Sequence, residues 1–352
     1  MLDLWITTVN ATVALPAGHE VARHQALILG LRDQRPTSLA QAPIEESTNA
    51  FLMVSPSTRW SLCRHTGFLV GCEYYGQPLL LGPVGDCFVR APIDNDICSS
   101  EVDNPSPHAW LARWRDSGLF DLEHTCIDVT LSEGIVVSCH EYRGEEHGEV
   151  TCLMRSRWTY SFNVDGSVDV SVKVEANESL LPLPRVGARL ILRRLPETVS
   201  WLGRGPHENY PDRKQSADLG YWCLPRGAMH TPYIFPSENG LRCDMRCAQL
   251  GDFVIERLDT DLAFSVSEFD IDTLMRAQHT NELDTADVLN VHIDGFHMGV
   301  GGDDSWSPSV KPSYLLNVRE YCWSFKLRAA AEYLEQLVHG NTATVASRDQ
   351  SQ

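Results

Sequence analysis

Residues 158–174 read Trp-Thr-Tyr-Ser-Phe-Asn-Val-Asp-Gly-Ser-Val-Asp-Val-Ser-Val-Lys-Val, and they carry the clearest structural signal in the chain. Apolar side chains occupy alternate positions on both sides of the pair Asp165-Gly166. A period of two is typical of a half-buried strand, and Asp-Gly favours a type I′ turn between two strands. The stretch therefore predicts an antiparallel β-hairpin.

Strand-like runs continue on both sides of this hairpin. Arg189 to Leu195 and Phe253 to Leu258 are predicted strands, and so is the segment that begins at Asn290. Residues 4–9 are a further strand candidate near the N-terminus. No series of alternating strands and helices is visible, so the chain does not encode an eight-fold barrel of strands and helices. The sequence predicts an all-β protein.

One helix interrupts the strand pattern. Ser106 is a suitable N-cap residue, and Pro107 suits the first helical position. Trp110, Leu111 and Trp114 would share one apolar face of this helix.

The charge of the chain excludes some classes of partner. Its 352 residues include 47 acidic and 29 basic side chains, which gives a formal net charge of −18. This excess argues against nucleic acid or an anionic membrane surface as a partner, whereas uncharged sugars are unaffected by it. No apolar run approaches the roughly 18 to 20 residues that a membrane span requires.

Eleven cysteines are scattered along the chain. An odd number excludes a fully paired disulfide framework within one chain, and the N-terminus has no signal-peptide pattern, so we expect reduced thiols and a cytoplasmic location. Cys243 and Cys247 have no second Cys/His pair at zinc spacing, which argues against a metal role for them.

A glycine-rich segment follows the strand that begins at Asn290. Gly299, Gly301 and Gly302 permit tight turns, and Trp306 is the single large aromatic residue after them. A loop of this kind could present the indole face to a ligand. The alternative is that Trp306 fills a core beneath the loop, which is the commoner place for a tryptophan.

Long stretches of the chain resemble the C-terminal domain of the family 2 β-galactosidases. The matching segments occur in the same order over roughly residues 1–327, and they are Arg90–Asp96, Trp110–Trp114, Trp201–Arg213, Thr231–Cys243 and Gly301–Val310. Several long segments in register are far more specific than any single short motif.

The resemblance implies a fold and a division into domains. Residues 1–46 would be the last strands of an immunoglobulin-like sandwich, with a linker over residues 32–48. Residues 47–327 would form a large antiparallel β-supersandwich of the galactose mutarotase-like kind. Residues 328–352 depart from the family, and we expect a short helix from Ala329 to Val338 and then a disordered tail.

The resemblance also implies an activity, the hydrolysis of terminal β-D-galactosides such as lactose with retention of configuration. The family holds both catalytic glutamates and a magnesium ion in a barrel that this chain lacks. We therefore assign no catalytic residue and no metal ligand here, although 47 acidic residues leave a carboxylate pair open from sequence alone. This chain would be a small subunit or a truncated C-terminal piece, and its partner would be a barrel-bearing large subunit or the missing N-terminal part of the same enzyme. The resemblance implies that the complete enzyme is an oligomer and holds magnesium and sodium.

Trp306 matches the family's substrate-contacting residue in this domain, because an indole covers the C–H face of a sugar. Asp303 and Asp304 are expected to cap the loop backbone, and His297 to be structural. Structural roles are also expected for residues 94–96 and for Asn209 and Asp212. Arg90 and Arg213 are expected to pair with these carboxylates.

Two other functions stay open. The supersandwich fold is shared with aldose 1-epimerases, which use a histidine and a glutamate, and His207 with Glu208 would be the candidates. Adjacent residues on a strand point to opposite faces, whereas Pro206 and Pro211 favour a turn. The third possibility is a carbohydrate-binding module with no enzyme attached.

Overall fold

The computed structural model describes residues 2–26, 40–98, 104–146, 148–193, 196–304 and 307–337. The chain divides into two compact units, residues 1–37 and residues 38–352. Within the described ranges no helix is long and apolar enough to cross a membrane.

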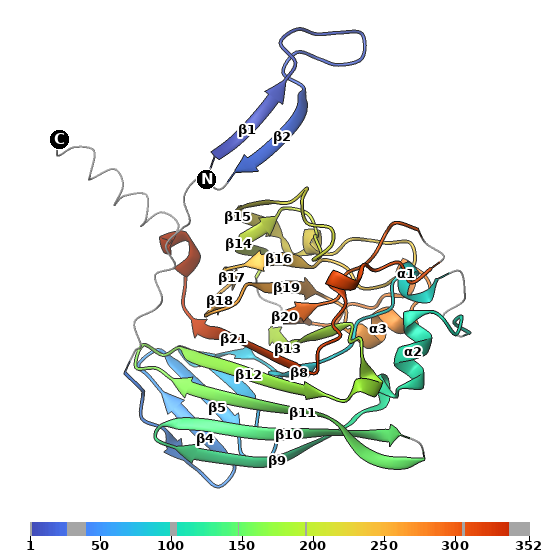
Figure 1. Ribbon diagram of the computed structural model, residues 1–352. Coiled ribbons are helices and arrows are strands. Elements are labelled where there is room, and N and C mark those ends of the chain that lie inside the picture. Colours follow the sequence, from blue (N-terminus) through green and yellow to red (C-terminus); the bar gives the residue numbers. More distant parts are fainter. Residues whose placement is uncertain are drawn as a thin grey trace, which may run out of the picture. The chain divides into compact units, whose positions relative to one another are not determined.

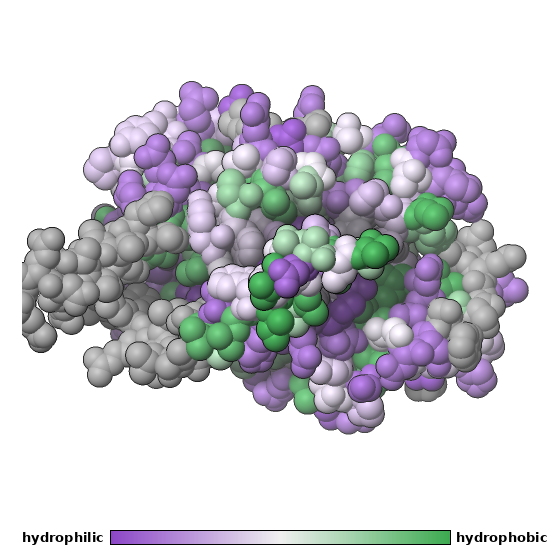
Figure 2. Space-filling view, turned by 90° about the horizontal axis from the view of Figure 1, so that it is seen from above, coloured by the Kyte–Doolittle hydropathy of each residue, from purple (hydrophilic) through white to green (hydrophobic). Residues whose placement is uncertain are grey.

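The first unit is an antiparallel hairpin of β1 (Leu2–Thr7) and β2 (Glu20–Ala26). Its apolar side chains are exposed, and Figure 2 shows several of them in green on the hairpin surface. Trp5 is 58% exposed and Ile6 is 63% exposed. Two strands alone do not enclose a core, so these side chains remain in contact with water.

The second unit consists of two large sheets in which every described strand pairing is antiparallel. The nine-stranded sheet has, in spatial order, β15 (Asp218–Pro225), β14 (Thr198–Gly205), β17 (Cys247–Leu250), β18 (Phe253–Arg257), β21 (Glu320–Ala329), β12 (Val168–Ala176), β11 (Glu149–Phe162), β10 (Ile135–Glu146) and β9 (Glu123–Ser132). The ten-stranded sheet has β16 (Arg242–Met245), β19 (Leu262–Ser267), β20 (Val288–His297), β13 (Arg185–Arg193), β7 (Gln77–Leu80), β6 (Leu69–Tyr74), β5 (Thr58–Cys63), β4 (Ala50–Val54) and β3 (Glu45–Glu46), while β8 (Gly85–Cys87) pairs with β13.

The hydrophobic core lies between the two sheets. In Figure 1, strands β9 to β12 form one layer in front of β4 and β5. Trp60 of β5 packs edge-on against Phe253 of β18 with ring centroids 6.3 Å apart, and both side chains are buried. The predicted all-β fold with a large antiparallel sandwich is confirmed.

Helices are few and short. Those with both ends inside the described ranges are α1 (Asp94–Ile97), α2 (Trp110–Asp116) and α3 (Ile271–Arg276), with 3-10 turns at Leu119–Asp121, Glu178–Leu180, Arg226–Met229, Thr280–Glu282 and Pro312–Tyr314. The predicted start of α2 is wrong. Ala109, with extended backbone, is the N-cap, and its N–H donates to the Ser106 carbonyl at 2.8 Å, so a separate turn precedes the helix.

The hairpin predicted around Asp165-Gly166 is confirmed, but its turn type is not. Strands β11 and β12 pair with Trp158 opposite Val172 and Phe162 opposite Val168. Only Gly166 has a positive φ, 83°, whereas a type I′ turn needs two such residues. The Asp165 carboxylate instead accepts hydrogen bonds from the Ser167 N–H (3.1 Å) and hydroxyl (2.6 Å), which stabilises a longer loop.

The predicted strands after Arg189 and Phe253 are confirmed as β13 and β18. Two boundaries differ from the predictions. The linker is shorter at its C-terminal end, because residues 45–46 already form β3 against β4. The C-terminal helix starts later, with residues 333–337 helical, because β21 continues to Ala329 and pairs there with Phe253. The tail after residue 337 lies outside the described residues.

Candidate functional site

The glycine-rich loop after β20 is anchored by Arg90, which comes from a distant part of the sequence. The Arg90 guanidinium donates to the carbonyl oxygens of Met298 (3.2 Å) and Gly299 (3.2 and 3.3 Å). It also donates to both carboxylate oxygens of Asp96, at 2.9 and 2.7 Å. Both side chains are fully buried. A buried ion pair is stable only when its remaining donors are satisfied, and the loop carbonyls do that here.

Asp212 and Asn95 fix the next residues of the loop. The Asp212 carboxylate accepts hydrogen bonds from the Val300 N–H (3.0 Å) and the Gly301 N–H (2.8 Å). The Asn95 side-chain amide donates to the Val300 carbonyl at 2.6 Å. Gly301 has a φ of 71°, a conformation that favours glycine. The path of the backbone as far as Gly301 is therefore set by side chains from two other segments.

Asp304 fixes the backbone at Ser307. These two residues lie on either side of residues 305 and 306, which are outside the described ranges. The Asp304 carboxylate accepts a hydrogen bond from the Ser307 N–H at 2.8 Å and contacts the Ser307 hydroxyl at 2.8 and 2.9 Å. The predicted capping role of Asp304 is confirmed, while Asp303 is exposed. Trp306 lies outside the described residues, so its assignment as a substrate contact stays a prediction.

A cluster of buried charges lies beside this loop. Arg185 on β13 forms ion pairs with Glu238 and with Asp294 on β20, each at 3.0 Å. Burial raises the pKa of Asp294 to about 7 even though Arg185 lowers it, and burial likewise raises the pKa of Glu238. The two carboxylates share one buried guanidinium and are themselves buried, which favours a structural role for them.

His297 belongs to the same cluster. It is buried, its Nδ1 lies 2.8 Å from the Met298 carbonyl oxygen, and its Nε2 lies 3.9 Å from a Glu238 oxygen. Burial, with the nearby Arg185 and Arg90, lowers the pKa of His297 well below its ordinary value. The imidazole is therefore neutral, and the carbonyl requires the proton on Nδ1. This agrees with the structural role expected for His297.

His207 and Glu208 do not converge on one point. They lie in an irregular segment after β14, where His207 is exposed and its Nε2 is 3.0 Å from the Ser216 hydroxyl. Glu208 is buried and accepts hydrogen bonds from the Gly240 N–H (2.8 Å), from Arg213 (2.7 Å) and from the Tyr233 hydroxyl. Burial raises the pKa of Glu208, but these donors more than compensate and hold it below its ordinary value. The paired acid and base of an epimerase are not formed by these two residues.

Sequence reasoning missed the Arg185 cluster altogether. Asp294 stands among apolar residues of a predicted strand, which is the one signal that could have indicated a buried, paired carboxylate. Nothing in the sequence indicates that Arg185 and Glu238 are its partners. Within the described ranges, no group of three or more His, Cys, Asp or Glu side chains is placed to hold a metal ion.

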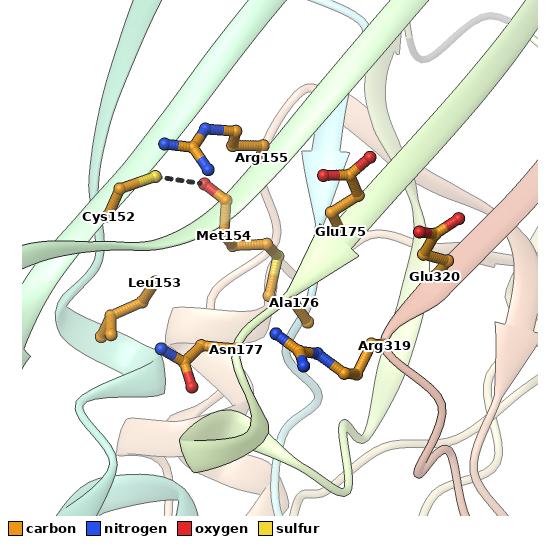
Figure 3. Close-up of a pocket in the computed structure, with 9 residues that line it drawn as sticks. All are labelled: Cys152, Leu153, Met154, Arg155, Glu175, Ala176, Asn177, Arg319 and Glu320. Carbon is orange, nitrogen blue, oxygen red and sulfur yellow. Dashed lines mark hydrogen bonds between the residues drawn. The ribbon is translucent and has the colours of Figure 1, made fainter.

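A separate hollow of about 400 Å³ lies on the open face of the nine-stranded sheet. Figure 3 shows that Arg155, Glu175, Arg319 and Glu320 border it. These side chains belong to ion pairs with neighbouring residues, among them Arg155 with Glu141 at 3.1 Å and Glu320 with Lys173 at 3.2 Å. Paired charges on an open sheet face are typical of a solvated surface.

Comparison with known proteins gives one family match and several relatives. The model of the family described as "Beta galactosidase small chain" matches residues 55–327. A β-galactosidase of Aeromonas hydrophila subsp. hydrophila is 41% identical over 336 residues, which are 93% of this chain and 32% of the relative. A β-galactosidase of Klebsiella pneumoniae is 41% identical over 335 residues, with the same two shares. The chain thus spans about a third of the length of these relatives.

Among solved structures, a galactose mutarotase-like protein from Lactobacillus casei is similar with a TM-score of 0.42. It is 10% identical in sequence, and the similarity covers 79% of this chain and 99% of that one.

Proposed function

Because this chain belongs to the β-galactosidase small-chain family, we propose that it completes a β-galactosidase as its C-terminal part or small subunit. The complete enzyme would hydrolyse terminal, non-reducing β-D-galactose residues, as in lactose, with retention. The observation that carries this proposal is the family match over residues 55–327, in a chain that spans 32% of its first relatives.

The catalytic carboxylates would come from a barrel that is not on this chain. Retaining hydrolysis needs two carboxyl groups about 5–5.5 Å apart on either side of the scissile bond. The carboxylates beside the glycine-rich loop have other partners: Asp96 pairs with Arg90, and Glu238 and Asp294 pair with Arg185. The Asp212 carboxylate accepts hydrogen bonds from two backbone N–H groups. Because these four carboxylates already have partners within the chain, we propose that the chain shapes the active site and performs no proton transfer.

Trp306 would form part of the wall of the active site. The backbone is anchored before it by Arg90, Asn95 and Asp212, and after it at Ser307, whose N–H donates to the Asp304 carboxylate. Anchors on both sides would limit the positions that the indole can take. A tryptophan held in this way would cover the C–H face of a galactose unit without requiring a hydrogen bond.

The partner would be the barrel-bearing part of the enzyme, and the hairpin of β1 and β2 is a candidate contact surface. Both strands have an unpaired edge, and exposed apolar side chains on such a hairpin favour association with another sheet or surface. By the same family membership, magnesium and sodium would be held by the rest of the enzyme. All eleven cysteines are free, which supports a cytoplasmic location.

The experiment that tests this proposal combines the purified chain with the barrel-bearing part of a close relative. We expect a stable complex on size-exclusion chromatography, and Trp5→Asp and Ile6→Asp should weaken it. Val54→Asp is the matched control, because Val54 is exposed on β4, outside the hairpin. Failure of the two parts to associate, or equal weakening by the control, would contradict the proposed contact.

A further inference from the structure

An apolar loop is exposed between the 3-10 turn Arg226–Met229 and strand β16. Residues 232–235 read Pro-Tyr-Ile-Phe, and we call them the 232–235 loop. Ile234 is 87% exposed and Tyr233 is 38% exposed. Among the described residues of the second unit, these two are the only adjacent large apolar side chains that are both exposed. A run of exposed apolar residues is unfavourable in water, so it indicates a surface that another molecule covers.

Hydrogen bonds fix the shape of this loop. The Thr231 N–H donates to the Asn239 side-chain oxygen at 3.0 Å, and the Tyr233 N–H donates to the Thr231 carbonyl at 2.9 Å. The Tyr233 hydroxyl donates to the buried Glu208 carboxylate. A loop that is already ordered loses little conformational entropy on binding, which favours affinity for a partner.

The 232–235 loop and the glycine-rich loop are attached to the same short turn. Glu208, which holds Tyr233, also accepts a hydrogen bond from Arg213 at 2.7 Å. The neighbouring Asp212 accepts hydrogen bonds from two backbone N–H groups of the glycine-rich loop, at 3.0 and 2.8 Å. Residues 208–213 therefore support both loops, and a partner that covers one of them lies beside the other.

The chemistry of the 232–235 loop favours a protein surface as its partner. Residues 229–237 contain no aspartate, glutamate, lysine or arginine, in a chain whose net charge is −18. Charged residues are depleted and aromatic residues are enriched at the centres of protein interfaces. A side chain as exposed as Ile234 protrudes from the surface, so it fits a recess in a partner better than it encloses a small molecule.

We propose that the 232–235 loop anchors this chain to the barrel-bearing part of the enzyme, with Ile234 in an apolar recess of that partner. This inference rests on the proposed function. The chain spans 32% of its first relatives, so about two thirds of such an enzyme lies outside it. If Trp306 forms part of the active-site wall, the partner must cover the glycine-rich loop. It would then also cover the 232–235 loop, which the same turn supports.

The loop would be one anchor of a larger interface. A stable interface buries roughly 800 Å² on each partner, which four residues do not supply. A few central side chains nevertheless contribute most of the binding energy, and they are commonly rigid and apolar or aromatic. The 232–235 loop belongs to the second unit, so this contact is separate from the one proposed for the hairpin of β1 and β2.

The test measures the dissociation constant of the complex between the whole chain and the barrel-bearing part, which are co-expressed and purified together. We expect Ile234→Asp to raise Kd at least about tenfold, because it places a charge in an apolar recess. Ile234→Leu keeps the apolar volume, and its Kd should be nearly that of the natural chain. The melting temperature of the isolated chain should change little in both variants, since Ile234 contributes almost nothing to the core.

Val164→Asp is the matched control. Val164 is 54% exposed in the turn between β11 and β12, so the variant adds the same charge at another exposed apolar position and should leave Kd unchanged. An unchanged Kd for Ile234→Asp, or an equal rise for the control, would overturn this inference and leave the proposed function standing. Absence of any complex with the natural chain would contradict the proposed function itself. If Ile234→Asp instead abolished self-association of the chain and left the complex intact, the loop would contact a second copy and not the barrel.

Discussion

Arg90 and Asp96 are joined by hydrogen bonds of 2.9 and 2.7 Å, and neither side chain has any exposed surface. The same guanidinium holds the carbonyl groups of Met298 and Gly299. One ion pair therefore connects the segment before α1 to the glycine-rich loop that follows β20. Loss of the guanidinium would leave the Asp96 carboxylate buried without a counter-charge, and the loop without its anchor.

Arg90→Ala is expected to lower the free energy of unfolding by about 3–5 kcal/mol, the usual effect of breaking a buried ion pair on one side. Chemical denaturation of the purified chain measures this change. The control is Arg64→Ala, which breaks an exposed pair with Glu46 at 3.1 Å and should cost less than about 1 kcal/mol. Similar losses in the two variants would show that the Arg90 pair is not an anchor.

Gly295→Ala is expected to destabilise the sandwich. Gly295 of β20 lies against Trp323 of β21, in the other sheet, and an added Cβ would come within 2.6 Å of the Trp323 Cβ. Neither backbone moves without disturbing a sheet, so we expect a loss of roughly 1–3 kcal/mol, as for overpacking in a core. Gly227→Ala is the control, because an added Cβ there meets nothing within 4 Å. A thermal melt that shifts equally for both variants would contradict this packing.

Asp86 should make the stability of the chain depend on pH. Burial raises the pKa of its carboxyl to about 6, despite donors from Ser156, Tyr142 and Trp158. The folded state thus holds the proton more tightly than the unfolded state. The contribution of Asp86 to the free energy of unfolding is therefore complete below about pH 4 and is lost as the pH rises through 6. Relative to Asp86→Asn, the natural chain should lose up to roughly 3 kcal/mol over that range. A flat or rising difference in denaturation experiments would be the opposite result.

The strands and the class of fold were predictable because alternation leaves a local signature. The hairpin of β11 and β12 needs only residues 158–174 to be recognised, and its register follows from the same alternation. The predicted turn type was wrong because the Asp165 carboxylate accepts hydrogen bonds from Ser167, and the Asp-Gly pair alone does not predict these bonds. Turn propensity reflects the average behaviour of a residue pair, and a local side-chain hydrogen bond to the backbone can favour a different turn.

The candidate site was less predictable because distant segments form it. Arg90 and the loop residues both belong to family-like motifs. They are about 200 positions apart in the chain, and no sequence pattern indicates that Arg90 contacts the loop. Arg185 and Glu238 meet Asp294 only because strands β13 and β20 pair in one particular register. A buried ion pair depends on tertiary packing, and a single sequence carries no record of its partners.

Trp306→Ala tests the proposed contact with the sugar in the assembled enzyme. If the indole packs on galactose equally in the ground state and the transition state, KM should rise while kcat changes little. The lost contact corresponds to about 1–3 kcal/mol, or roughly ten- to hundredfold in KM. Melting temperature should be nearly unchanged. A large drop in melting temperature with unaltered KM would instead identify Trp306 as a core residue.

If this chain contributes to a β-galactosidase without carrying its catalytic carboxylates, it should not hydrolyse a β-galactoside by itself. The direct measurement is turnover of a chromogenic β-galactoside by the purified chain alone, and again after addition of the barrel-bearing part. We expect no turnover above background by the chain alone, and turnover at ordinary enzyme rates by the mixture. Turnover at those rates by the isolated chain, abolished by substitution of one of its own glutamates, would contradict it.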